Sequence, residues 1–319
     1  MKLSLRIILA ATLVLSLSCG PKKVAPAPSV RDFPMAEIPM MITEPQERLV
    51  WLSRHFWDRF TATDSLYFCD SVTVNGVPKA KLEEQMGLFA TFLQQVPPSE
   101  GVQAMGACYD RIAAFQTAWP AGNVFTEVTE LVTRYLYDPN SPVRSEQMYL
   151  PFVQRLASSP LVDPAMQPAY AWDARMCALN RIGTPATDFT FIDTAGKRRT
   201  LYSIKAGRTL LIFGNPDCHA CKELVTAIGE TPQLQQMISS GALKVVDIYI
   251  DEDIDIWKER MADYPADWVN GYDATFSIRG ELLYNVRALP SMYLLDENKT
   301  VLLKDATADQ VLDALLPAF

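Results

Sequence analysis

The segment 210–221 reads LLIFGNPDCHAC, and it decides the fold of the C-terminal part of the chain. Its first four residues are all apolar, which is typical of a buried β-strand. A short turn with glycine and proline follows. Cys218 and Cys221 then begin a stretch to Ile228 that we expect to be helical. Two cysteines three residues apart, placed between a buried strand and a helix, are typical of a redox-active dithiol.

The spacing of Cys218 and Cys221 assigns each thiol a different role. Residues three apart share one face of the first helical turn, close enough for a disulfide. Backbone amides at the helix N-terminus favour an anion, and the pKa of a cysteine there falls from about 8.5 to roughly 3.5–7.5. A thiolate attacks a disulfide, and a neighbouring thiol resolves the mixed disulfide. We therefore predict that Cys218 is the nucleophile and Cys221 the resolving thiol.

Two other interpretations of this cysteine pair were weighed. A zinc site needs about four ligands, but the chain has no second C-x-x-C motif and only two histidines, His55 and His219, so no metal is expected. A structural disulfide stays open, although a bridge across one helical turn closes a short loop and constrains the unfolded chain little.

Predicted strands and helices alternate around the dithiol. We expect strands at 189–192, 210–213, 245–250, 292–295 and 301–303, and helices at 218–228, 254–261 and 308–316. A β-α-β half followed by a β-β-α half predicts an α/β domain over residues 183–319.

This C-terminal region resembles the periplasmic thiol–disulfide oxidoreductases of thioredoxin fold, which are akin to peroxiredoxins and cytochrome-c-maturation reductases. The matching segments are GTPATDF (183–189), DTAGK (193–197), the strand with its C-x-x-C motif, and LPS (289–291). The resemblance implies a thioredoxin-like fold and a cis-proline at Pro290 that supports the dithiol.

The chain departs from the thioredoxin pattern at two positions. Thioredoxins have a tryptophan directly before the first cysteine and a buried carboxylate six residues before it, where this chain has Asp217 and Ile212. The sequence therefore identifies no proton acceptor for Cys221. An imidazolium at His219 would favour the Cys218 thiolate and a carboxylate at Asp217 would disfavour it. We take His219 as active-site support and expect Asp217 to be a helix N-cap.

Residues 43–182 have apolar side chains at helical spacing, and the alternation typical of strands is missing. Stripes occur at Leu49, Leu52, Phe56 and Phe60; at Leu82, Met86, Phe89 and Leu93; at Met105, Tyr109, Ile112, Phe115 and Trp119; and at Val124, Val128, Leu131 and Tyr135, with two more helices expected at 145–158 and 164–182. We predict an all-α domain that begins at a capping box of Thr43 and Gln46 and ends before a C-terminal cap at Gly183. Its three cysteines, Cys69, Cys108 and Cys177, are expected to be free thiols, although a Cys69–Cys108 bridge stays open.

The N-terminus has the pattern of a targeting segment. Residues 1–18 combine a basic start with an apolar run that is typical of a signal peptide. Cys19 follows a small residue and resembles the lipidated cysteine of bacterial lipoproteins, although Ser16 replaces the usual leucine; an ordinary signal peptide is the alternative. Residues 19–42 are rich in proline and predict an extended tether. The whole chain resembles Bacteroidota lipoproteins in which a helical domain of unknown function precedes a thioredoxin-like domain.

Charge and motifs together predict the function. A net charge of −8 over 319 residues argues against a general nucleic-acid binder. We predict a lipid-anchored, periplasm-facing oxidoreductase of the cell envelope. It would exchange disulfides with proteins or small thiols, use no dissociable cofactor, and receive electrons from a membrane thiol carrier. One alternative is a binding module with a vestigial dithiol. The other is a thiol peroxidase, which is disfavoured because Asn215 stands where peroxiredoxins have a threonine.

Overall fold

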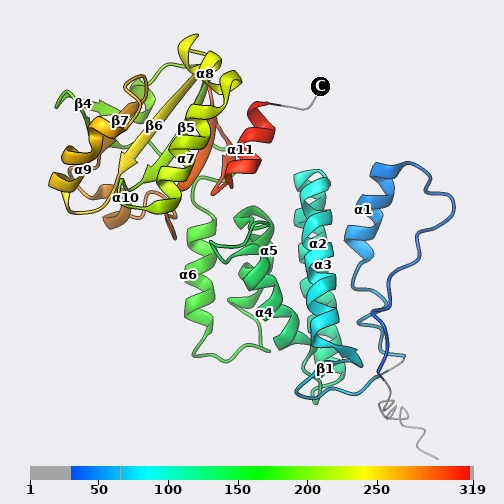
Figure 1. Cartoon of the computed structure of the whole chain (residues 1–319). Helices are drawn as coiled ribbons and strands as arrows, with labels where there is room; N and C mark the ends of the chain where they lie inside the picture. The colour runs from blue at the N-terminus through cyan, green and yellow to red at the C-terminus, as the bar shows by residue number, and fades with distance from the viewer. Residues whose placement is uncertain (1–29, 65, 317–319) are drawn as a thin grey trace, which may run out of the picture.

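The computed structural model describes residues 30–64 and 66–316. The predicted signal peptide 1–18 and the predicted lipidation site Cys19 lie outside these residues. Figure 1 shows two parts, which we call the helical region (α1–α6) and the sheet region (β3 to α11). Within the described ranges, no helix combines the length and the apolar composition that a bilayer crossing requires.

The helical region follows the apolar stripes of the sequence. Its helices are α1 (Pro45–His55), α2 (Lys79–Gln95), α3 (Pro98–Ala118), α4 (Val124–Leu136), α5 (Glu146–Leu156) and α6 (Gln167–Cys177). All four predicted apolar residues of α2 are buried. The same holds for Met105, Tyr109, Ile112 and Phe115 of α3 and for Val124, Val128 and Leu131 of α4. A small hairpin of β1 (Thr73–Val74) and β2 (Val77–Pro78) was not predicted; Asn75 and Gly76 form its turn with positive φ.

The beginning of α1 differs from the prediction. Glu44, not Thr43, is the N-cap residue, and it makes no side-chain capping bond, so the predicted capping box is absent. The helix ends at His55, and Phe56 and Phe60 therefore lie in the turns that follow. Both rings are nevertheless fully buried, because these turns fold back over the core.

Residues 31–35, which the sequence analysis places in the tether, pack against the helical region. The Phe33 ring stacks on Phe60 with 5.2 Å between centroids. Arg31 donates to the carbonyl of Asn75 at 2.9 Å and lies over the Tyr67 ring, 3.9 Å from its centroid. Aromatic and cation–π contacts of this kind hold this part of the predicted tether on the fold instead of extending it away.

The last helix of the helical region is shorter than predicted. α6 ends at Cys177, so Gly183 is not its C-terminal cap. Gly183 instead lies in the connection to the sheet region, with φ 81° and its amide donating to the carbonyl of Val301 at 2.8 Å.

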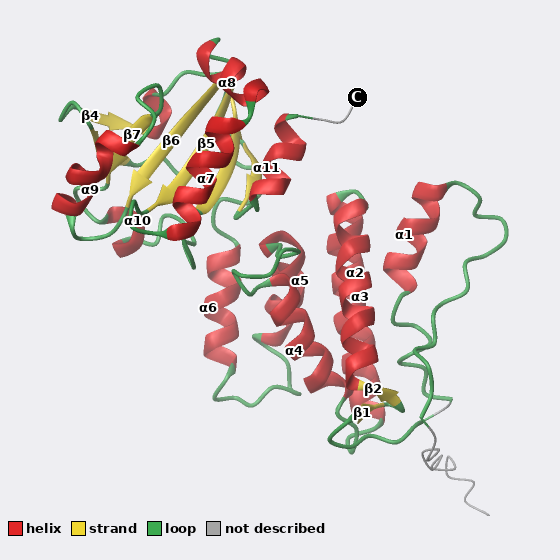
Figure 2. Ribbon diagram, viewed as in Figure 1, coloured by secondary structure: helices red, strands yellow, loops and turns green. Residues whose placement is uncertain are grey.

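The sheet region contains a seven-stranded sheet in the order β4-β3-β7-β6-β5-β8-β9 (Figure 2). The strands are β3 (Thr190–Asp193), β4 (Arg198–Thr200), β5 (Arg208–Gly214), β6 (Leu243–Tyr249), β7 (Val269–Tyr272), β8 (Ser291–Asp296) and β9 (Val301–Lys304). β5, β6 and β7 are parallel, so their C-terminal ends lie at one edge of the sheet. β4 and β7 were not predicted from the sequence. β7 has the turn-like sequence VNGY, and a β-carbon at Gly271 would lie 2.5 Å from the Phe191 ring.

Alternation along β5 divides the core of the sheet region into two layers. Leu211 and Phe213 belong to one apolar layer, and Leu210 and Ile212 to the other. The second layer is covered by α7 (His219–Glu230), α8 (Pro232–Ser239) and α11 (Ala308–Leu315). Two short helices, α9 (Ile254–Arg260) and α10 (Ser277–Gly280), follow β6 and β7, and α8 and α10 were not predicted.

Candidate functional site: a dithiol at the start of α7

Cys218 and Cys221 lie at the start of α7, directly after the C-terminal end of β5. Cys218 is the N-cap residue, and its Sγ accepts the backbone N–H of Cys221 at 3.4 Å. The predicted N-cap, Asp217, is therefore one residue too early. Cys218 is half-exposed, whereas Cys221 is only 2% exposed. The first sulfur is open to a substrate and the second lies behind it.

The segment before β8 forms the other side of the site. The carbonyl of Leu289 lies 3.6 Å from the Cys218 Sγ, within hydrogen-bonding reach of the thiol. The Leu289–Pro290 peptide bond is cis, as the resemblance implied. A segment 71 residues later in the chain therefore lies beside the nucleophile.

Cys221 is held in its protonated form. Burial raises its pKa most, followed by the hydrogen bond of its thiol to Cys218, and the negative charge of Asp247 raises it further. A thiol in this state must lose its proton before it can attack a disulfide. If Cys221 is to attack a disulfide, a nearby group must accept its proton.

Asp247 is a buried carboxylate whose negative charge acts on Cys221, and it was not predicted from the sequence. It lies on β6, is 5% exposed, and stands opposite Ile212 in the parallel ladder with β5. A β-carbon at Gly214 would lie 2.7 Å from the Asp247 Oδ1, so the carboxylate occupies the space beside the end of β5. Burial alone raises the pKa of Asp247 to about 7. The available signal was an aspartate inside the apolar run 245–250.

Tyr264 is a further acid beside the dithiol that sequence reasoning did not identify. It is half-buried, and burial raises the pKa of its phenol most. The negative charges of Asp247, Cys221 and Cys218 raise this pKa further. The phenol therefore stays protonated and is able to donate a hydrogen bond.

His219 lies away from the two sulfurs. Its side chain is 88% exposed, and its Nε2 lies 3.2 Å from the Glu223 Oε1 one turn further along α7. The neighbouring Asp217 lies 3.6 Å from the Arg260 Nε, and Asn215 donates to Asp251 at 2.7 Å. Of the predicted site residues, Cys218, Cys221 and Pro290 are brought together, and His219 is on the outer surface.

The other described cysteines, Cys69, Cys108 and Cys177, form no disulfide. Burial raises the pKa of Cys108 and of Cys177, which makes both thiols unreactive. Among residues 30–64 and 66–316, no three metal-ligating side chains of the histidine, cysteine, aspartate and glutamate type gather at one place.

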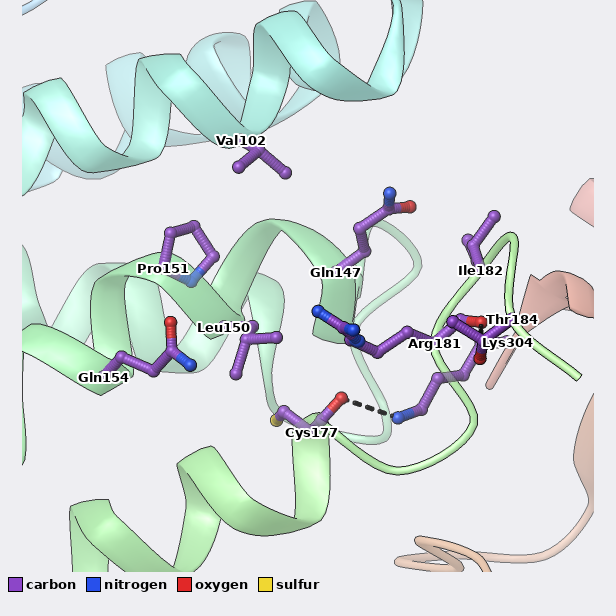
Figure 3. A pocket seen from close by; sticks show the side chains of 10 residues that line it. All are labelled: Val102, Gln147, Leu150, Pro151, Gln154, Cys177, Arg181, Ile182, Thr184 and Lys304. Carbon is purple, nitrogen blue, oxygen red and sulfur yellow. Dashed lines mark hydrogen bonds between the residues drawn. The ribbon is translucent and has the colours of Figure 1, made fainter. Parts of the chain in front are cut away.

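Figure 3 shows the residues that line a pocket. The volume of this pocket is about 390 Å³. It is lined by Val102, Gln147, Leu150, Pro151, Gln154, Cys177, Arg181, Ile182, Thr184 and Lys304. Lys304 donates to the carbonyl of Cys177 at 2.8 Å here. None of these residues belongs to the segment 210–221, so this pocket does not include the dithiol. The dithiol remains the candidate active site.

A dithiol at this position of this fold defines a thioredoxin-like protein. A thioredoxin-like protein from Bacteroides caccae, known from its crystal structure, is 32% identical, with 90% of this chain and 99% of that chain covered and a TM-score of 0.76. Residues 16–176 match the family described as a domain of unknown function (DUF5106). The chain therefore belongs to the DUF5106 family.

Other solved structures match less than half of the chain. The C-terminal domain of an uncharacterized protein from Bacteroides fragilis is 45% identical, with 43% of this chain and 97% of that chain covered and a TM-score of 0.42. The thioredoxin domain of a thiol–disulfide oxidoreductase from Bacteroides vulgatus is 18% identical, with 42% and 95% covered and a TM-score of 0.38. No curated protein matches the chain.

Proposed function

We propose that this protein is a thiol–disulfide oxidoreductase that uses Cys218 and Cys221. The observation that supports this most directly is the unequal exposure of the two sulfurs at the start of α7. Cys218 is half-exposed and receives a backbone N–H, while Cys221 is buried behind it. An open nucleophile with a shielded resolving thiol is the arrangement that dithiol exchange requires.

The reaction proceeds in two exchanges. The Cys218 thiolate attacks one sulfur of a substrate disulfide, that S–S bond breaks, and the first substrate sulfur leaves as a thiolate. Cys221 then attacks the Cys218 sulfur, a Cys218–Cys221 disulfide forms, and the second substrate sulfur leaves. The substrate gains two electrons and the protein loses two, so a dithiol donor must reduce the protein again.

Asp247 is the proposed proton acceptor for the second exchange. The Cys221 thiol gives its proton to the Asp247 carboxylate as its sulfur attacks Cys218. A pKa of about 7 suits this task, because the group is then able to accept and return a proton near neutral pH. Tyr264 is proposed to donate a hydrogen bond to the sulfur that carries the charge.

The proposed substrate is a protein or small molecule with a disulfide, and the proposed electron donor is a membrane thiol carrier. We further propose that Cys19 is lipidated and holds the protein on a membrane facing the periplasm. Replacing Cys19 with alanine is then expected to move the protein from the membrane fraction to the soluble fraction. Retention of the Cys19→Ala protein in the membrane fraction would contradict the anchor.

Insulin reduction tests the proposed activity. With dithiothreitol as electron donor, the full-length protein is expected to accelerate the precipitation of insulin chains. The single variants Cys218→Ser and Cys221→Ser are expected to lose this acceleration. Cys69→Ser is the matched control, because Cys69 is a half-buried thiol in the helical region and should leave the rate unchanged. Equal rates for wild-type protein and Cys218→Ser would refute the proposal.

A further inference from the structure

Glu146 at the start of α5 is a buried carboxylate that joins the helical region to the sheet region. Its side chain is 0% exposed. Its Oε1 accepts from the Asn285 Nδ2 at 2.5 Å and from the Arg287 Nε at 3.1 Å. Its Oε2 lies 2.7 Å from the Lys304 Nζ. All three partners belong to the sheet region, so each of these contacts crosses the junction between the helical region and the sheet region.

Arg287 is fixed from both regions at once. Its Nη2 donates to the Asp305 Oδ2 at 2.5 Å, and its guanidinium lies over the Tyr137 ring at 4.2 Å from the centroid. A planar guanidinium with two carboxylate partners and an aromatic face has few alternative positions. The backbone of Arg287 is therefore positioned by the helical region as well as by the sheet.

The segment that Glu146 holds leads directly to the dithiol. We call residues 285–290 the proline segment. Asn285 and Arg287 form its first half, and the Leu289 carbonyl in its second half lies 3.6 Å from the Cys218 Sγ. In Figure 1 the edge of the sheet region that includes the start of α7 faces α5 and α6. Asn285 and Arg287 precede Leu289 by only four and two residues.

We propose that Glu146 is a positioning residue for the dithiol, and that the helical region completes the active site by holding the proline segment against Cys218. The inference rests on the proposed oxidoreductase function. A buried carboxylate is tolerated only when its partners satisfy it, so the Glu146 contacts specify one placement of Asn285 and Arg287. The helical region thus sets the width of the space beside Cys218 in which a substrate disulfide must fit.

Glu146→Gln tests the proposal, because it keeps the size of the side chain and removes the charge. We expect kcat/KM for insulin reduction by the full-length protein to fall by about tenfold or more, since small displacements beside a reacting atom slow catalysis strongly. Iodoacetamide labelling of reduced Cys218 should become faster, because the Leu289 carbonyl no longer covers it, while Cys221 should remain unlabelled. Asn285→Asp added to Glu146→Gln returns a carboxylate to the junction and should restore part of the lost kcat/KM.

Ser145→Ala is the matched control. Ser145 caps α5, and its hydroxyl accepts the N–H of Met148 at 3.3 Å, a bond within the helical region. It should lower the midpoint of thermal unfolding and leave kcat/KM and the labelling of Cys218 unchanged. If Glu146→Gln fails to fold, Asn285→Ala is the substitute, because Glu146 then keeps both cations.

The outcomes separate this inference from the proposed function. Unchanged kcat/KM and labelling in Glu146→Gln, or an equal loss in Ser145→Ala, would overturn the positioning role. A wild-type protein that fails to reduce insulin would refute the proposed function instead. The labelling rates, which need no turnover, would then still show whether Glu146 controls access to Cys218.

Discussion

Asp247 stands directly opposite Ile212 in the parallel ladder of β5 and β6. Paired residues in a ladder point to the same face of the sheet, so Asp247 brings a carboxylate to the face where α7 covers Ile212. Ile212 occupies the position where thioredoxins have their buried carboxylate. The chain therefore has a buried carboxylate on the same face of the sheet, but on the neighbouring strand.

Asp247→Asn is expected to slow the second exchange selectively. In rapid mixing of the reduced protein with excess 5,5′-dithiobis(2-nitrobenzoate), the first release of thiolate reports attack by Cys218 and the second reports attack by Cys221. At pH 7 the second phase should be about 10²-fold slower in the variant, a typical loss for a missing general base. The first phase should change little.

The pH dependence of that second phase provides its own check. Only the ionised carboxylate accepts a proton, so the wild-type rate should rise as the pH increases toward 7 and level off above it. The charged groups that act on neighbouring Tyr264 are Asp247, Cys221, Cys218 and Asp217, and each of them is an acid that becomes negative when it loses its proton. Asp273→Asn, a buried carboxylate that accepts from the Ile278 N–H, should keep the wild-type profile. The same profile in Asp247→Asn would exclude Asp247 as the acceptor.

Asp247 should also make the fold less stable as the pH rises. Burial raises the pKa of its carboxyl from the ordinary value of 3.8 to about 7, so the folded protein keeps a proton that the unfolded chain releases. This contribution to stability is complete below the unfolded pKa and is lost as the pH rises through the folded one. Relative to Asp247→Asn, the free energy of unfolding of the wild-type protein should fall by up to about 4 kcal/mol between these two values. Urea denaturation at several pH values measures it, and a constant difference would contradict the prediction.

Gly214→Ala should be destabilising because of Asp247. The added β-carbon would lie 2.7 Å from the Asp247 Oδ1, so the carboxylate must move or the strand must shift. We expect a loss of about 1–3 kcal/mol, typical of overpacking. In Asp247→Ala the same glycine substitution should cost much less, since the obstructing atom is gone. A double-mutant cycle in urea measures the coupling, and additive losses would show that the two residues do not meet.

The two serine variants should trap partners unequally. Cys221→Ser retains the exposed nucleophile and should accumulate mixed disulfides in cells, removable with dithiothreitol. Cys218→Ser should accumulate almost none, because the remaining thiol is 2% exposed and its pKa is raised by burial. Non-reducing electrophoresis with mass spectrometry measures both. Equal trapping would mean that nucleophile and resolving thiol are wrongly assigned.

The features that the sequence by itself determined are local in the chain. The apolar strand and the two cysteines three residues apart lie within 210–221, and the positions of β5 and α7 follow from that one segment. The buried faces of α2, α3 and α4 follow from apolar spacing near 3.6 residues, because a helix that must bury one side requires this spacing. The exposed and buried roles of Cys218 and Cys221 follow from their places in the first turn.

Other features were decided only by the tertiary structure, because they join segments distant in the chain. Asp247 is placed opposite Ile212 by the register of β5 and β6, which depends on how the two strands pair and not on either sequence alone. Glu146 reaches Asn285 across 139 residues, once the helical region packs against the sheet region. The short strand β7 likewise depends on pairing with β6, and the position of Phe33 depends on packing against Phe60. Periodicity reports which face of an element is buried, but the partner of a buried charge is fixed only when the elements assemble.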